Sequence, residues 1–128
     1  MRRVVDPADA VAADVISAGD GIISVDLPRG AAFTDEVAAR TSTQLRVLSG
    51  GHPCRVLMRM TGVTSISRLA RSMLGRQTNA SAIALVGESP VDRVIANFVL
   101  GAEPSECPVR YFDSEPQALA WLERDNAA

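Results

Sequence analysis

The spacing of hydrophobic residues changes along the chain, and these changes mark the expected strands and helices. Residues 12–17 and 22–27 predict a hairpin, because a glycine-containing turn separates them and the second segment alternates apolar with polar positions. Residues 35–49 instead repeat apolar positions with a period of about 3.6, which is typical of a helix. Thr34 fits the N-cap of this helix, and Gly50 fits its C-terminal stop.

The rest of the chain continues the alternation of strand and helix. The predicted strands are residues 54–60, 82–86 and 109–112, and the predicted helices begin at Ser67, Ser89 and Ser114. The signal at Ser89 is the clearest, because Pro90 follows at the first helical position and Asp92 at the third. The apolar residues of this helix form one predicted stripe, made of Val91, Val94, Ile95, Phe98 and Val99.

This order of elements predicts an α/β fold. A hairpin is followed by three strands, each reached through a helix, and a last helix ends the chain. Such alternation favours a mainly parallel, five-stranded sheet with four helices. We find no linker or internal repeat, so residues 1–128 are interpreted as one domain, in which residues 1–10 form a loose or disordered arm.

Composition narrows the classes of function. The apolar runs are far shorter than the roughly 20 residues that span a bilayer, and no signal peptide follows Met1, so we expect a cytoplasmic protein without membrane insertion. The net charge of −2 and the dispersed arginines argue against nucleic-acid binding. Cys54 and Cys107 are far apart in the sequence and are expected to be buried thiols.

The sequence also lacks the usual catalytic motifs. It contains no nucleophile elbow, no dinucleotide-binding fingerprint and no phosphate-binding loop with its lysine. The single histidine, His52, lies in a predicted helix-to-strand loop, away from the sheet edge where ligands bind in open α/β folds. The carboxylates are interpreted as solvated surface groups. We therefore predict no enzyme activity, no metal site and no cofactor.

The loops that follow the predicted strands form the edge of the sheet where a ligand or partner is most expected to bind. The candidate ligand or interaction residues there are Thr61, Thr64, Ser65, Ser67, Arg68 and Ser89. Ser67 and Ser89 each precede a predicted helix, where free N–H groups could hold an anion. Both serines also fit ordinary helix caps, and the sequence leaves both interpretations open.

Several segments resemble STAS domains, which have the SpoIIAA-like fold of sporulation anti-sigma-factor antagonists. They are residues 56–67, 89–101, 108–112 and 118–122. The later segments look like an uncharacterised bacterial group that is related in fold to CRAL-TRIO lipid carriers. The resemblance covers about residues 15–124. It implies a βα superhelix with a largely parallel sheet, and regulation or ligand binding in place of catalysis.

The phosphorylation switch of STAS domains has only a partial counterpart in this chain. The family's phosphorylated serine falls on Arg68, the preceding aspartate falls on Ser67, and the glycine falls on Ala70. The resemblance therefore leaves Ser67 as a possible, displaced phosphoacceptor.

Two non-enzymatic functions are weighed against the disfavoured enzyme. The first is a non-enzymatic STAS-like regulatory or interaction module, which forms a homodimer or binds a regulatory protein through the helix of residues 90–101, where Leu100 lies outside the predicted stripe. The second is a small-molecule or lipid carrier of the CRAL-TRIO-like type. Its pocket would be lined by Met58, Met60, Met73 and Phe98.

Overall fold

The computed structural model describes residues 14–19, 21–27, 29–30, 32–68, 70, 80–101 and 107–125. Its main sheet has five strands in the order β1-β2-β4-β6-β7. These strands are β1 (Asp14–Gly19), β2 (Ile22–Asp26), β4 (Cys54–Arg59), β6 (Ala80–Val86) and β7 (Val109–Phe112). β1 pairs antiparallel with β2, and the other neighbours are parallel, which confirms the predicted hairpin and mainly parallel sheet.

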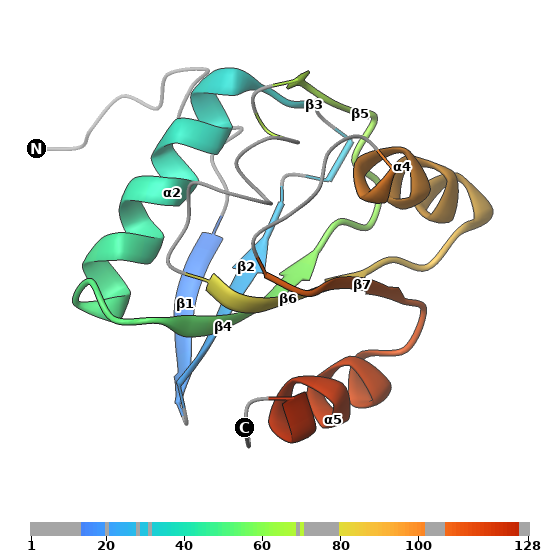
Figure 1. Ribbon diagram of the computed structural model, residues 1–128. Coiled ribbons are helices and arrows are strands. Elements are labelled where there is room, and N and C mark those ends of the chain that lie inside the picture. The colour runs from blue at the N-terminus through green and yellow to red at the C-terminus, as the bar shows by residue number, and fades with distance from the viewer. Residues whose placement is uncertain are drawn as a thin grey trace, which may run out of the picture.

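Helices cover both faces of this sheet (Figure 1). Helices α2 (Asp35–Ser49) and α4 (Pro90–Leu100) lie on one face, and α5 (Glu115–Asp125) lies on the other. The helix expected after Ser67 falls mostly on residues 71–79, which are outside the described residues, as is the arm of residues 1–10. Within the described part, no helix has the length and apolar character needed to cross a membrane.

A second, two-stranded sheet was not predicted. It pairs β3 (Ala32–Phe33) in parallel with β5 (Ser65–Ile66), and the Ser67 N–H donates to the Phe33 carbonyl at 3.0 Å. Each strand has only two residues, too few to show a hydrophobic period in the sequence. This small sheet fixes the loop after β4 against the loop after β2.

The bounds of α2 agree with the predicted helix because both of its ends have strong local signals. The Thr34 hydroxyl accepts a hydrogen bond from the Val37 N–H at 3.2 Å. Gly50 ends the helix with φ of 66°, a left-handed conformation that glycine adopts without a steric penalty. The N–H groups of Gly50 and Gly51 then donate to the Val47 and Arg46 carbonyls, which satisfies two of the terminal carbonyls.

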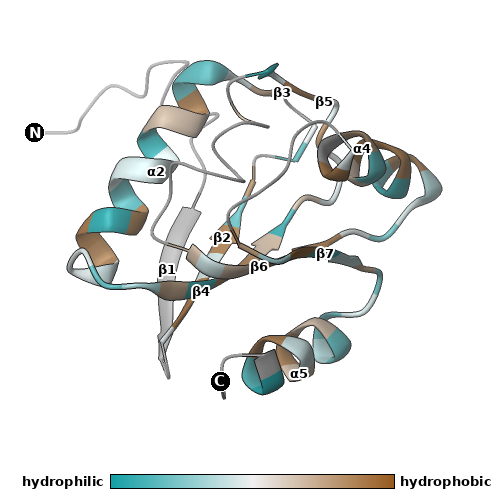
Figure 2. Cartoon of the chain, in the orientation of Figure 1, coloured by the Kyte–Doolittle hydropathy of each residue, from teal (hydrophilic) through white to brown (hydrophobic). Residues whose placement is uncertain are grey.

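The core lies in two layers, one on each face of the sheet. Successive side chains of β4 point to opposite faces of the sheet. Val56 and Met58 face the side of α2 and α4, and Leu57 faces α5. The hydrophobic colour along the central strands in Figure 2 follows from this two-sided burial. Arg55 also faces α5, where its guanidinium donates to the Leu122 carbonyl at 3.3 Å.

Candidate functional site

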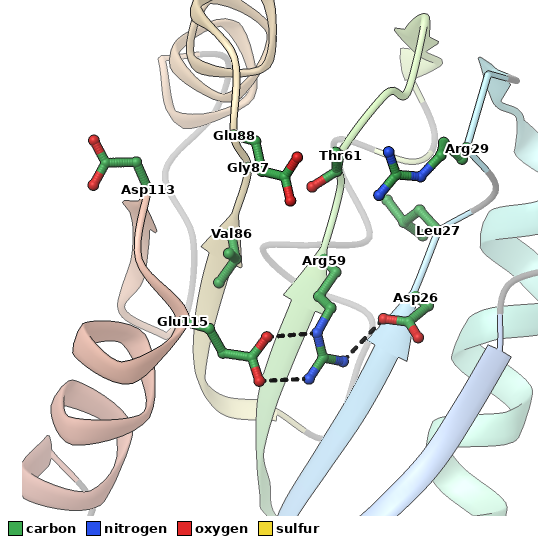
Figure 3. A pocket seen from close by; sticks show the side chains of 10 residues that line it. All are labelled: Asp26, Leu27, Arg29, Arg59, Thr61, Val86, Gly87, Glu88, Asp113 and Glu115. Atoms are coloured by element: carbon green, nitrogen blue, oxygen red, sulfur yellow. Dashed lines mark hydrogen bonds and ion pairs between the residues drawn. The ribbon is translucent and has the colours of Figure 1, made fainter.

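A hollow of about 350 Å³ opens at the carboxyl ends of β2, β4 and β6 (Figure 3). The residues that line it are Asp26, Leu27, Arg29, Arg59, Thr61, Val86, Gly87, Glu88, Asp113 and Glu115. Leu27 and Val86 are buried and make its apolar wall, whereas most of the other lining residues are charged. The carboxyl ends of strands are where open α/β sheets bind their ligands, which makes this hollow the candidate site.

Arg59 is the centre of an ion cluster in this hollow. The parallel register pairs Asp26 with Arg59, so both side chains leave the same face at the ends of neighbouring strands. Arg59 Nη1 donates to Asp26 Oδ1 at 2.9 Å and also to the Ser24 hydroxyl. Its Nε and Nη2 donate to the two carboxylate oxygens of Glu115, each at 2.8 Å. This bidentate pair fixes the start of α5 against the end of β4.

Arg59 and Glu115 stabilise each other's charged forms. Hydrogen bonds from Arg59 hold the pKa of the Glu115 carboxyl below its ordinary value, although partial burial opposes that shift. The hydrogen bond to Glu115 is the largest effect and raises the pKa of the Arg59 guanidinium; burial opposes it, and the hydrogen bond to Asp26 adds to the rise. The three side chains are between 33% and 48% exposed, so water screens their attraction.

Replacing Glu115 with glutamine is expected to lower the free energy of unfolding by about 1 kcal/mol at pH 7. The lost ion pair stabilises the fold fully above the ordinary glutamate pKa of about 4.3, and this contribution fades as the pH falls through the lowered pKa. Urea unfolding of wild type and variant at neutral and acidic pH measures the difference. Glu123→Gln, on the exposed side of α5, is the control. An E115Q effect that is equal at both pH values would contradict the prediction.

Asp92 is a buried carboxylate that joins three segments near the hollow. Its side chain is 2% exposed, which corrects the expectation that the carboxylates are solvated surface groups. Oδ1 accepts from the Gly62 N–H at 3.1 Å, and Oδ2 accepts from the N–H groups of Glu88 at 2.9 Å and Ser89 at 3.2 Å. The Ser89 hydroxyl accepts the Asp92 N–H in return at 3.1 Å, which completes a reciprocal cap.

These contacts decide the charge of Asp92. Burial raises the pKa of its carboxyl, but the hydrogen bonds from the three N–H groups outweigh burial, so the pKa lies below the ordinary value. Hydrogen bonds from the backbone therefore stabilise the anionic form of Asp92.

The predicted edge residues are dispersed around the hollow. Thr61 lines it, whereas Thr64 and Ser65 are exposed in and beside β5. The Ser67 hydroxyl accepts the Ala70 N–H at 3.1 Å and so acts as a cap. Arg68 next to it is exposed. Ser89 caps α4. A ligand role for these residues, and phosphorylation of Ser67, remain predictions.

Sequence reasoning missed the charged residues that line the hollow. The sequence could have indicated Asp26 and Arg59, because each lies near the carboxyl end of a predicted strand. The carboxyl ends of neighbouring parallel strands lie side by side. No comparable signal existed for Glu115, which lies 56 residues beyond Arg59 in the sequence.

The predicted apolar stripe of α4 is divided between two faces of the helix. Asp92 and Ala96 face the sheet, and Ile95 is partly buried. Val91, Val94 and Phe98 are 63%, 66% and 59% exposed, so the prediction of a single stripe is wrong. The helix buries the face that carries Asp92 and Ala96, so these three side chains lie outward. We call Val91, Val94 and Phe98 the α4 stripe.

A second hollow, of about 360 Å³, lies beside the α4 stripe. It is lined by Glu88, Ser89, Pro90, Arg93, Val94, Tyr111 and Asp113. Arg93 lies over the Tyr111 ring, 5.0 Å from its centroid, and pairs with Asp113 at 3.1 Å. The only charged residue that α4 exposes in its first two turns is therefore already paired.

The remaining candidates for chemistry lie apart from both hollows. His52 is exposed in the loop between α2 and β4. Cys54 is buried, and burial raises the pKa of its thiol. Among the described residues, no group of histidine, cysteine and acidic side chains has the arrangement that holds a metal ion. Met58 and Met60 are packed in the core, and Met73 is outside the described residues.

The sheet and its helices define a SpoIIAA-like α/β fold. The structure is similar to an uncharacterised protein of the DUF3478 family from Shewanella loihica PV-4, which has a SpoIIAA-like fold. That likeness has a TM-score of 0.56 at 19% sequence identity and covers 87% of this chain and 92% of that chain, so it shows the fold alone. The sequence match extends to a family: residues 16–125 match the domain of unknown function DUF7793, and the chain belongs to that family.

A protein of unknown function from Arthrobacter sp. FB24 is 44% identical to this chain. The match covers 86% of this chain and 98% of that one, with a TM-score of 0.35. No curated protein matches the sequence. The resemblance to CRAL-TRIO carriers remains a prediction.

Proposed function

We propose that the chain is a non-enzymatic SpoIIAA-like module that acts through protein contact, and that the α4 stripe binds a second copy of the chain. The observation that carries this proposal is the exposure of Val91, Val94 and Phe98 at helical spacing on one face. Burying one such side chain contributes roughly 1.5–3 kcal/mol, so three of them on each copy supply a substantial driving force.

The charge around the stripe supports a second copy as the occupant. On α4, Asp92 is buried and Arg93 is paired with Asp113, so the face carries no unpaired charge within the described residues. Two such faces can therefore meet in an isologous contact without repulsion between like charges. Asn97 is exposed beside the stripe and is neutral, which adds no repulsion.

The residues that line the candidate site also support a function without catalysis. Thr61 is the only side chain lining the first hollow that bears a hydroxyl or thiol, and that lining includes no histidine. The donors of Arg59 are directed at two carboxylates and one hydroxyl of the protein itself. A nucleophile activated by an adjacent base is thus missing from the described lining, which supports binding over turnover.

Replacing Val94 with glutamate is expected to weaken the dimer by about a hundredfold, because an isologous contact uses the residue twice and buries each new charge. Sedimentation velocity over a concentration series up to about 0.5 mM measures the monomer–dimer equilibrium. The matched control is Val47→Glu on α2, where Val47 is 74% exposed away from the stripe.

The V47E variant should dimerise as the wild type does. A monomeric wild type at the highest concentration would overturn self-association. A dimer that tolerates V94E would place the contact elsewhere.

A further inference from the structure

We infer that the hollow at the carboxyl ends of β2, β4 and β6 binds a small zwitterion of the free amino-acid class, held between Arg29 and Glu88. This site is separate from the α4 stripe, and it does not depend on self-association. Its volume of about 350 Å³ is at the lower end of small-molecule sites, so the ligand must be small.

Pairing within the protein leaves one charge of each sign in the hollow. Asp26 and Glu115 are bound to Arg59, and Asp113 is bound to Arg93. Neither Arg29 nor Glu88 has an ion-pair partner among the described residues, and both side chains are exposed. In Figure 3 the guanidinium of Arg29 and the carboxylate of Glu88 appear on either side of Thr61.

The backbone that carries these two groups is fixed in advance. Asp92 accepts hydrogen bonds from the N–H groups of Glu88 and Gly62, and the Gly62 carbonyl accepts the Gly30 N–H at 2.8 Å. The stem of Arg29 lies against Gly62, where a Cβ atom would come within 2.9 Å of Arg29 Cγ. The absence of a side chain at Gly62 therefore leaves room for Arg29 at the rim. Such preorganisation lowers the entropic cost of binding.

The chemistry of the lining selects a zwitterion. A guanidinium binds a carboxylate with two parallel hydrogen bonds, and the Glu88 carboxylate suits an ammonium group. The Thr61 hydroxyl can donate or accept a hydrogen bond between them. Leu27 and Val86, which are 6% and 7% exposed, provide an apolar wall for the carbon atoms of the ligand.

Other ligand classes fit this lining less well. A simple anion would meet four carboxylates and only two guanidiniums in the hollow, and one of those guanidiniums is already paired. A metal ion lacks a suitable cluster of ligands among the described residues. A lone cation would leave Arg29 without a partner.

The twenty common amino acids, titrated singly into the full chain by isothermal calorimetry, test this inference. The amino acid that binds most tightly is then compared with its amide, which lacks the carboxylate, and with its N-acetyl derivative, which lacks the ammonium charge. Each derivative should bind about tenfold more weakly or worse, because one charged contact is lost. This series uses the wild type alone, so it does not depend on the folding of any variant.

Two variants locate the site. Glu88→Gln and Arg29→Met, the latter keeping an unbranched stem, should each weaken binding by about tenfold or more. Glu36→Gln, at an exposed position on α2, is the matched control and should bind as the wild type does.

Three results would overturn the inference. They are the absence of binding of every amino acid at about 10 mM, an amide that binds as tightly as its parent, and unchanged affinity in both site variants. The second of these would indicate a simple cation site, and the third would place binding elsewhere.

Discussion

Replacing Asp92 with alanine is expected to lower the free energy of unfolding by about 3 kcal/mol. The buried carboxylate accepts hydrogen bonds from the N–H groups of Gly62, Glu88 and Ser89, and alanine would leave all three donors without this acceptor. The lost bond from the Ser89 N–H is also half of the reciprocal cap at the start of α4, whereas the Asp92 N–H can still donate to the Ser89 hydroxyl. Asp92 is thus expected to be a structural residue that supports both proposed surfaces.

Urea unfolding followed by circular dichroism measures this effect. Asp113→Ala is the control, because the Asp113 side chain is 61% exposed and its pair with Arg93 is expected to contribute less than about 1 kcal/mol. The stabilisation from Asp92 should be complete above the ordinary aspartate pKa of about 3.9 and should be lost as the pH falls through the lowered pKa. Similar losses in D92A and D113A would contradict this account.

Replacing Gly87 with alanine is expected to cost about 2–3 kcal/mol for a steric reason. A Cβ atom at Gly87 would lie 2.6 Å from Asp92 Cβ and 2.7 Å from the Tyr111 hydroxyl oxygen. The backbone has little freedom to move away, since the Gly87 N–H donates to the Phe112 carbonyl at 3.1 Å. The added methyl group must therefore displace both Asp92 on α4 and the Tyr111 ring.

Thermal and urea unfolding of the G87A variant test this expectation. Gly101→Ala is a suitable control, because its added Cβ would meet only the Asn97 carbonyl, at 3.4 Å. That variant should stay within about 1 kcal/mol of the wild type. A G87A variant as stable as G101A would show that the segment around Tyr111 can move.

Local signals were enough to predict much of the fold. The bounds of α2 follow from its period, from the Thr34 cap and from Gly50, all of which act within a few residues of the chain. The strand β7 also has its predicted bounds, and the hairpin and parallel order of the main sheet are confirmed. The two-stranded sheet of β3 and β5 was missed, because strands of two residues show no period.

The role of Asp92 could not be predicted from local signals. The sequence shows an acid at a helix N-terminus, which is usually exposed to solvent and interacts only with its own helix. In this fold the same carboxylate also binds the Gly62 N–H of the loop after β4, 30 residues earlier. This contact belongs to the buried face of α4, and the α4 stripe lies outward, so the helix has its predicted place in the sequence but exposes residues that were expected to be buried.

The sequence by itself determined the α/β order of the elements, the caps of α2 and α4, and the loops after the strands as the edge to examine. These features depend on hydrophobic period and on hydrogen bonds between residues a few positions apart. Only the tertiary structure decided which charges meet at that edge. Strand register places Arg59 beside Asp26, and the position of α5 places Glu115 beside Arg59. Arg29 and Glu88 have no ion-pair partners among the described residues. The strength of an ion pair depends on the distance between the two charges. Residues 30 or more positions apart in the sequence come close together only when the sheet forms.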